Sequence, residues 1–200
     1  MITARVSHIA AYARWKAQED AELGWLINSI TKDEPTEAMA KGTAFHKFLE
    51  NAAALSETEQ VTIDGYTFAF TGQFDLYLPL MREWRKGLDY GGIIVSGQVD
   101  AIEGTTIFDH KTTERFDAEK YLESWQWRYY LDIFSADRFV WNVWEMNELD
   151  EPQAYGVHHL HKLEQFRYPD LHADCVALAQ EYRDFAEQHL SRHNTELEAA

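Results

Sequence analysis

The sequence predicts a mixed α/β fold in which helices cover a central sheet. Three observations predict it. The expected elements run in the order helices, strands, a helix, more strands and a helix. Hydrophobic residues make up 46% of the 200 residues and aromatic residues 14%, enough for one sizeable core. No repeat or linker-like stretch divides the chain. We expect a single domain over 1–200, with a helical N-terminal part (1–56), a core (about 57–165) and a C-terminal helix (about 169–192).

Two helices are predicted before the first strand. Ser7 can cap the first helix, because apolar residues follow it at helical spacing, at Ile9, Ala10 and Ala13. The second helix is expected over about 36–55, with Pro35 near its start. The N-terminal part is therefore expected to be helical throughout.

The middle of the chain predicts strands around one helical stretch. The segment VTIDGYTFAF alternates about Asp64-Gly65, a strong signal for a hairpin with a two-residue turn. Residues 72–90 have a mostly helical pattern, which Pro79 would break or turn. Two further strands are expected on either side of Glu103-Gly104.

The C-terminal half predicts a helix, a strand pair and a final helix. The first helix is expected over about 117–134. The segments RFVWNVWEMN and QAYGVHHLHKLEQF are expected to pair across a turn at 148–152. A long amphipathic helix follows from 169 to about 192, and the last residues, NTELEAA, are expected to be frayed.

Composition excludes several classes of protein. Cys175 is the single cysteine, so one chain cannot form an internal disulfide or a cysteine-based zinc or iron–sulfur site. We expect Cys175 to be a small core residue. The net charge of −16 argues against a protein that coats nucleic acid, although metal ions and local cations can offset charge at a single site. The chain shows no signal-peptide pattern and no membrane-spanning run, so we expect a cytoplasmic protein without a membrane partner.

The stretch GQVDAIEGTTIFDHKTT places charged residues on strands, where such residues are disfavoured. If Glu103-Gly104 forms the turn, Asp100 opposes Ile107. Opposed residues share a face and side chains alternate along a strand. Asp100, Asp109 and Lys111 are therefore expected on one side of the hairpin.

Two carboxylates that converge in a folded protein repel each other unless a proton or a cation lies between them. Carboxylate oxygens are preferred ligands of Mg²⁺ and Mn²⁺, so a hard divalent ion would resolve the repulsion. Lys111 could then orient or help to deprotonate a water, or offset the charge of a phosphate. His110 is expected to project from the opposite side of the hairpin. The alternative is an exposed, charged hairpin face without a ligand.

Two helical segments add candidate site residues. In GTAFHKFLE, His46 and Glu50 lie one turn apart, on a different face from the apolar residues. In ESWQWRYYLDIF, Gln126 and Tyr130 have the same spacing, which suits hydrogen bonding and stacking with a nucleotide strand. Arg128, and Arg14 on the first helix, could reach phosphates; the alternative is that these side chains only pack or face solvent.

These motifs, in this order, resemble the RecB-like branch of the PD-(D/E)XK nuclease superfamily, over about 42–130. The family pattern is Gly-x-x-x-His on a helix, an Asp at a strand end, (Asp or Glu)-x-Lys on the paired strand and Gln-x-x-x-Tyr on the next helix. In this chain the pattern falls on Gly42 to His46, Asp100, Asp109 to Lys111, and Gln126 to Tyr130. The resemblance implies a restriction-endonuclease-like core with a central mixed sheet flanked by helices.

The resemblance also implies residue roles. It makes Asp100, Asp109 and Lys111 catalytic, and it implies metal ligation by His46, Asp100, Asp109 and the backbone carbonyl of His110. Glu50 would stand near the metal or hold a second ion. Residues expected to hold DNA are Gln126, Tyr130, Arg128 and Arg14. The cofactor would be Mg²⁺ or Mn²⁺, without an iron–sulfur cluster.

The implied reaction is metal-dependent hydrolysis of a DNA phosphodiester. We expect an exonuclease that acts at single- or double-stranded DNA ends in recombination, repair or replication, in the host cytoplasm if the chain is phage-encoded. A homo-oligomer or a recombination partner protein is compatible with this expectation. Two alternatives stay open: a structure-specific endonuclease, and an inactive, acidic, protein-binding member of the fold.

Overall fold

The computed structural model of the protein describes residues 2–31, 35–52, 60–72, 74 and 76–198. The strands are β1 (Ile2–Arg5), β2 (Gln60–Ile63), β3 (Tyr66–Phe70), β4 (Met81–Asp89), β5 (Ile93–Glu103), β6 (Thr106–Thr113), β7 (Arg138–Glu148) and β8 (Ala154–Phe166). The helices are α1 (Val6–Ala17), α2 (Leu23–Thr31), α3 (Glu37–Asn51), α4 (Ala118–Leu122), α5 (Trp125–Ile133) and α6 (Leu171–Glu198). The predicted α/β class is confirmed. No helix in these ranges has the length and apolar character needed to cross a membrane.

One mixed sheet joins the eight strands of the described residues, in the order β1-β5-β6-β7-β8-β3-β2. The pairs β1–β5, β6–β7 and β3–β8 are parallel, and the remaining pairs are antiparallel. β4 pairs with the other edge of β5, because Ile94 has Thr3 of β1 on one side and Asp89 of β4 on the other. β1 and β6 therefore share one edge of β5, end to end.

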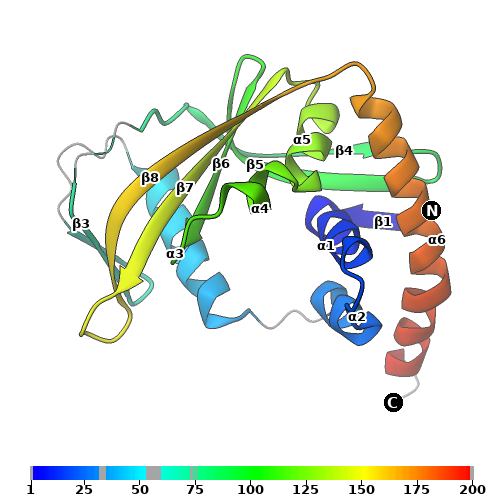
Figure 1. Ribbon diagram of the computed structural model, residues 1–200, viewed down its shortest axis with the longest axis horizontal. Helices are drawn as coiled ribbons and strands as arrows, with labels where there is room; N and C mark the ends of the chain where they lie inside the picture. The colour runs from blue at the N-terminus through cyan, green and yellow to red at the C-terminus, as the bar shows by residue number, and fades with distance from the viewer. Residues whose placement is uncertain (1, 32–34, 53–59, 73, 75, 199–200) are drawn as a thin grey trace.

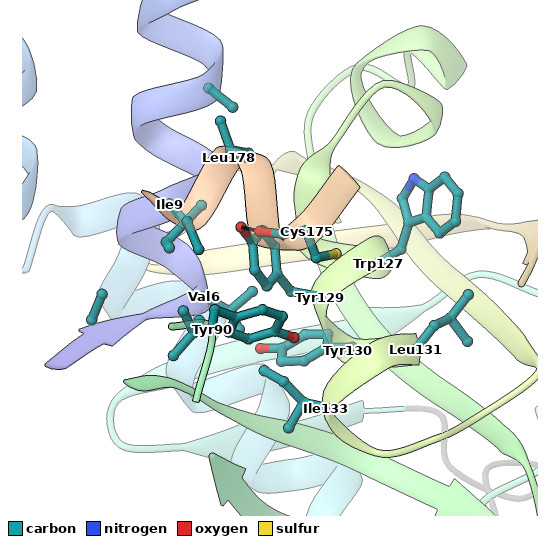
Figure 2. Packing of buried hydrophobic residues seen from close by; sticks show 14 of the residues in the cluster. Val6, Ile9, Tyr90, Trp127, Tyr129, Tyr130, Leu131, Ile133, Cys175 and Leu178 are labelled. Atoms are coloured by element: carbon teal, nitrogen blue, oxygen red, sulfur yellow. Dashed lines mark hydrogen bonds between the residues drawn. The ribbon is translucent and has the colours of Figure 1, made fainter. Parts of the chain in front are cut away.

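Helices cover the two faces of this sheet separately (Figure 1). Along β7, Trp141 and Val143 belong to a core built with α1, α5 and α6, whereas Trp144 and Met146 belong to a second core built with α3. Figure 2 shows the first core, where α1, α5, α6 and the residue that follows β4 contribute Val6, Ile9, Tyr129, Ile133, Cys175, Leu178 and Tyr90. The predicted burial of Cys175 is confirmed, because its side chain is fully enclosed there.

The buried carboxylate of Asp132 ties the first core together. It accepts a hydrogen bond from Tyr90 Oη at 2.9 Å and lies 2.8 Å from His172 Nδ1. Tyr129 Oη donates to the carbonyl of Cys175 at 2.7 Å. These contacts fix α5 against α6 and against the end of β4, so the helix that carries Gln126 and Tyr130 has a defined position over the sheet.

Several predicted elements are confirmed. The β2–β3 hairpin turns at Asp64-Gly65, with Ile63 opposite Tyr66. α3 begins after Thr36, whose side chain accepts a hydrogen bond from the Met39 N–H at 3.3 Å. β7 and β8 pair antiparallel as expected. The predicted extension of α3 over 53–55 lies outside the described residues.

The N-terminal prediction is wrong in two respects. A four-residue strand, β1, precedes the first helix, and the residue at the helix start is Arg5 rather than Ser7. Ala4 in this short strand is buried. Parallel pairing with Ile93–Ser96 of β5 holds β1 in the sheet. Ser7 lies inside the first turn of α1 and makes no capping hydrogen bond.

The prediction that residues 72–90 are mostly helical is also wrong, because β4 occupies Met81–Asp89. Charged residues are typical of edge strands, and in this segment they imitate the polar face of a helix. Pairing with β5 along almost its whole length decides the conformation. Pro79 precedes this strand and interrupts no helix.

The helix predicted over 117–134 is two helices. α4 ends at Leu122, and Ser124 begins α5 by accepting a hydrogen bond from the Gln126 N–H at 3.2 Å. At the C-terminus the helix is longer than predicted, because α6 continues to Glu198, through residues that were expected to be frayed. Local capping chemistry outweighs the continuous helical pattern at Ser124.

Candidate active site

The site lies where β5 and β6 separate. Their pairing ends at Ala101 opposite Phe108, while β6 remains paired with β7 as far as Thr113. On the same edge of β5, pairing with β1 ends at Ser96. The intervening edge of β5, residues 97–100, is therefore open toward the interior, and Asp100 stands at its end.

The hairpin register differs from the predicted one. Glu103 pairs with Thr106 and Ile102 with Ile107, so the two turn residues are Gly104 and Thr105. Gly104 has a φ of +55°, which places the flexible residue within the turn. The predicted pairing of Asp100 with Ile107 is wrong by two residues. A shift of two would by itself keep Asp100 on the face of Asp109. The contacts differ from that prediction, because Asp100 lies beside His46 of α3 whereas Asp109 contacts Gln126 of α5, on the other face of the sheet.

Asp100 is held between a helix and a strand. Its Oδ2 atom accepts a hydrogen bond from the backbone N–H of His110 at 2.6 Å and lies 3.4 Å from Nδ1 of His46 on α3. Burial alone would raise the pKa of Asp100, but hydrogen bonding and charge from His46, with the charge of Lys111, outweigh it and lower this pKa. For His46, burial lowers the pKa, and the Asp100 carboxylate more than compensates, so the net pKa is raised.

Asp109 is 1% exposed and forms an ion pair with the Lys111 ammonium. Burial, reinforced by the charge of Asp100, raises the pKa of Asp109 to about 6, while Lys111 opposes that shift. Burial would lower the pKa of Lys111, but the two carboxylates reverse this effect and raise it. The ion pair lies on the α5 side of the sheet, where Nε2 of Gln126 donates to Asp109 Oδ1 at 3.4 Å.

Tyr130 supports this arrangement from the interior. It is 6% exposed, its ring stacks on Phe139, and its hydroxyl accepts a hydrogen bond from Gln126 Nε2 at 3.3 Å. The ring lies against the backbone of Gly97, in the open edge of β5. A Cβ atom at Gly97 would lie 2.4 Å from Tyr130 Cε1, so glycine is required for this contact.

Arg82 connects the opposite side of the site to α3. Its guanidinium donates to the carbonyls of Leu49, Glu50 and Ala52 at the end of the helix, and to the carbonyl of Pro79 at 2.8 Å. Helix C-terminal carbonyls lack partners within the helix, and a guanidinium is a favourable partner for them. This contact anchors the helix that carries His46 to β4.

A cavity lies under α3, on the side of Asp100 away from the Asp109–Lys111 ion pair. Its lining residues include His46, Glu50, Glu83, Asp100 and His110. His110 projects toward α3, with its ring 6.3 Å from that of His46, in agreement with its predicted direction away from Asp109. Burial lowers the pKa of His110 to about 4, so its ring is neutral.

Glu83 is a site residue that sequence reasoning missed. The sequence pattern predicts a helix for its segment, and MREWRK contains no motif that marks its one carboxylate as a site residue. In the structure Glu83 lies between the pairs Arg82–Ala101 and Trp84–Val99, at the level of Asp100. Burial raises its pKa, and the charge of Asp100 adds to this effect, against a hydrogen bond from Gln98.

Two predicted DNA-binding residues do not join the cluster. Arg14 lies over the ring of Trp25, with 5.6 Å from its guanidinium carbon to the ring centre. Arg128 packs over Trp125 and Trp127 and donates to the Ser124 carbonyl at 3.0 Å. The expected roles of these two arginines stay predictions.

The donor set fits a hard divalent cation. It comprises the carboxylates of Asp100 and Asp109 and the His110 carbonyl, oxygen donors of the kind that such ions prefer, together with the His46 imidazole. The repulsion that contributes to the raised pKa of Asp109 is the repulsion that a cation would relieve. As they stand, no three His, Cys, Asp or Glu side chains among the described residues converge closely enough to hold an ion. Binding would therefore require Asp109 to exchange its Lys111 partner for the ion.

Comparisons with known proteins place the fold. No family model and no curated protein matches the chain. A crystal structure of LHK-Exo in complex with dAMP aligns with a TM-score of 0.51 and 13% identity, over 97% of this chain and 94% of that chain. The alkaline exonuclease LHK-Exo from Laribacter hongkongensis aligns with a TM-score of 0.49 and 14% identity, over 98% and 94%. A crystal structure of SSO0001 aligns with a TM-score of 0.49 and 15% identity, over 90% and 74%. The chain thus has a central mixed sheet flanked by helices, similar to an exonuclease fold.

Proposed function

We propose that the chain is a divalent-metal-dependent deoxyribonuclease of the PD-(D/E)XK type, in its RecB-like branch. The observation that carries the proposal is that two charged pairs, His46 with Asp100 and Asp109 with Lys111, lie where β5 and β6 separate. These residues come from α3 and from two strands, so the sequence alone does not require them to meet. The fold similarity to LHK-Exo, whose structure was solved with dAMP, supports a nucleic acid substrate.

The chain's own residues can position the reacting groups. Mg²⁺ or Mn²⁺ held by His46, Asp100, Asp109 and the His110 carbonyl would supply an activated water and neutralise phosphate charge. Lys111 pairs with Asp109 in the structure, and the two carboxylates raise the pKa of its ammonium above the ordinary value. Released from Asp109, it can orient the attacking water or stabilise the charge that develops on the phosphate.

Gln126 and Tyr130 serve Asp109 in this proposal. The Gln126 amide orients the Asp109 carboxylate, and the Tyr130 hydroxyl fixes the Gln126 amide. An amide that releases one of these partners could also bind a nucleotide strand at the mouth of the site. We further propose that the substrate is a DNA end, as in recombination, repair or replication.

The test compares cleavage of end-labelled linear DNA and of a closed circle, with Mg²⁺ or Mn²⁺, for the wild type and Lys111→Ala. We expect the wild type to shorten linear DNA, and the variant to lose at least about 100-fold in rate, since one electrostatic catalytic group contributes about 10²–10³. Equal activity in the variant would remove Lys111 from the mechanism. Prompt nicking of the circle would favour a structure-specific endonuclease.

Two further variants separate chemistry from stability. Lys111→Ala leaves the buried Asp109 carboxylate without its partner, so some loss of stability is expected. Lys111→Arg keeps the positive charge beside Asp109 and should melt close to the wild type while still losing activity. Lys47→Ala, which removes an exposed lysine of α3 paired with Asp64, should leave cleavage unchanged.

A further inference from the structure

A stack of four rings runs from the first core to the surface of the protein. The ring of Phe116 stacks on that of His161, with ring centres 3.9 Å apart and an angle of 3° between the planes. Phe116 also stacks on Tyr121 at 6.1 Å and 14°, and His159 stacks on His161 at 5.8 Å and 29°. Tyr121 is buried in the first core, whereas His159 is exposed. The ring stack therefore ends in an imidazole that solvent can reach.

The register of the sheet places this ring stack on the same face as the catalytic lysine of the proposed function. Val143 of β7 pairs with Lys111 of β6 on one side and with His161 of β8 on the other. These three residues form one row across the sheet and share a face. Neighbouring strands lie about 4.8 Å apart, so His161 is about 10 Å from Lys111 along the row. His159 pairs with Glu145 in the next row, on the same face.

Glu145 holds two of the four rings in place. Its Oε2 atom lies 2.7 Å from Nε2 of His161, and its carboxylate accepts a hydrogen bond from the backbone N–H of Phe116. The hydrogen bond with His161, aided by that from Phe116, lowers the pKa of Glu145, so the carboxylate is ionised. A negative charge at this position disfavours a phosphate, whereas an uncharged nucleobase meets no such repulsion. Flat rings that are fixed in advance and end at an exposed ring suit the stacking of a base.

We propose that His159 stacks on an unpaired base of the DNA strand that the candidate active site cleaves. The inference rests on the proposed function and extends it to the form of the substrate. Stacked nucleotides rise by about 3.4 Å each, so the distance from Lys111 corresponds to about three nucleotides beyond the scissile phosphate. A base inside a duplex is covered by its neighbours and cannot stack on a side chain. The substrate is therefore DNA that is single-stranded for at least about three nucleotides beside the cleaved bond.

The experiment measures binding of fluorescently labelled DNA to the full chain by anisotropy, with Ca²⁺ in place of Mg²⁺ to suppress cleavage. The DNA is a duplex with a single-stranded extension, on the 5′ strand in one series and on the 3′ strand in another. One base of the extension is replaced by an abasic position, which is moved stepwise along the strand. In the wild type, we expect the abasic position that removes the stacked base to weaken binding about fivefold or more.

Three variants assign this effect to the ring of His159. His159→Ala should bind the intact DNA about fivefold or more weakly and should lose its sensitivity to the abasic position. His159→Phe keeps a flat ring and should behave as the wild type. The matched control is His158→Ala, because His158 lies on the other face of β8, beside Thr71. His159 is exposed, so its truncation should leave the melting temperature nearly unchanged.

The outcomes separate this inference from the proposed function. If His159→Ala keeps the wild-type dependence on the abasic position, or if no position stands out in the wild type, the inference is overturned. Metal-dependent DNA cleavage would then leave the proposed function standing. Equal weakening in His158→Ala and His159→Ala would assign the effect to the conformation of β8 and would also overturn the inference. A wild type that neither binds nor cleaves DNA would overturn both.

Discussion

Asp100 and Asp109 are the same residue type on the neighbouring strands β5 and β6, yet their pKa values shift in opposite directions. For Asp100, burial raises the pKa, but the hydrogen bond and charge of His46 outweigh burial and lower it. For Asp109, burial and the charge of Asp100 raise the pKa to about 6. Divergent protonation of paired carboxylates is typical of catalytic sites. The spacing of Asp109 and Lys111 predicts which residues meet, but not how deeply each is buried. The pKa difference is therefore a property that emerges only from the fold.

Gly97 offers a test of the support behind Asp109. The substitution Gly97→Ala would place a Cβ 2.4 Å from Tyr130 Cε1 and 3.0 Å from Val6 Cγ2, so the ring must move. Overpacking of this kind costs about 1–3 kcal/mol, and the free energy of unfolding should fall by that amount. Urea denaturation followed by tryptophan fluorescence measures this change.

A glycine without neighbours provides the control for Gly97→Ala. At Gly24, on α2, a Cβ would meet nothing within 4 Å. Gly24→Ala should leave stability unchanged or raise it by up to about 1 kcal/mol, because alanine is the better helix former. A Gly97→Ala protein as stable as Gly24→Ala would show that the Tyr130 ring is not confined by the backbone of β5.

At the scale of elements, prediction succeeded where the signal is local. The Asp64-Gly65 turn and the alternation in β7 and β8 each lie within a few residues of the structure that they predict. β1 and β4 were not predicted because both depend on pairing with β5. For β1 this partner is distant in the sequence, and for β4 the composition of the segment does not indicate the pairing. Because the segment of β4 was predicted to be helical, Glu83 was not recognised as a neighbour of Asp100. The error about this element therefore became an error about the site.

Ser124 is the residue that divides the predicted helix over 117–134. Its side chain accepts a hydrogen bond from the Gln126 N–H at 3.2 Å and begins the helix that carries Gln126 and Tyr130. Loss of such a cap costs about 1 kcal/mol, so Ser124→Ala should lower the melting temperature by about 2–4 °C. Differential scanning calorimetry measures the shift.

Ser7→Ala is the matched control for the cap at Ser124. Ser7 was predicted to cap α1, but it lies within that helix, is exposed and caps nothing. Alanine at an exposed helical position is neutral or slightly stabilising. If Ser7→Ala and Ser124→Ala lowered the melting temperature equally, the division between α4 and α5 would have a different cause.

At the scale of the whole molecule, the site forms because β5 and β6 separate, so that side chains from both faces of the sheet approach the same place. α3 packs on one face and brings His46, while α5 packs on the other and brings Gln126. Closely paired strands would keep these side chains apart. The separation of β5 and β6 beyond Ala101 lets groups from both faces approach Asp100 and Asp109. The order of the motifs in the sequence predicts this set of residues. It does not predict the unpaired part of the β5 edge, which exists because β1 pairs only with Ile93–Ser96 and β6 only with Ala101–Glu103.

Cys175 reports on the integrity of that assembly. Its side chain is fully buried where α6 packs against α5, and burial raises the pKa of its thiol above the ordinary value. Alkylation needs an accessible thiolate, so the native protein at pH 8 should resist iodoacetamide, and the single thiol should react fully in denaturant. Mass spectrometry of the intact chain counts the label.

The rate of labelling carries further information. If α6 leaves the core only when the whole molecule opens, stabilising or destabilising variants should change the labelling rate in proportion to the population of the unfolded state. Gly97→Ala should then accelerate labelling of Cys175, although the two residues lie on β5 and α6, and Ser7→Ala should not. Rapid labelling of the wild type, without any effect of Gly97→Ala, would mean that α6 detaches by itself while the sheet and the site remain folded.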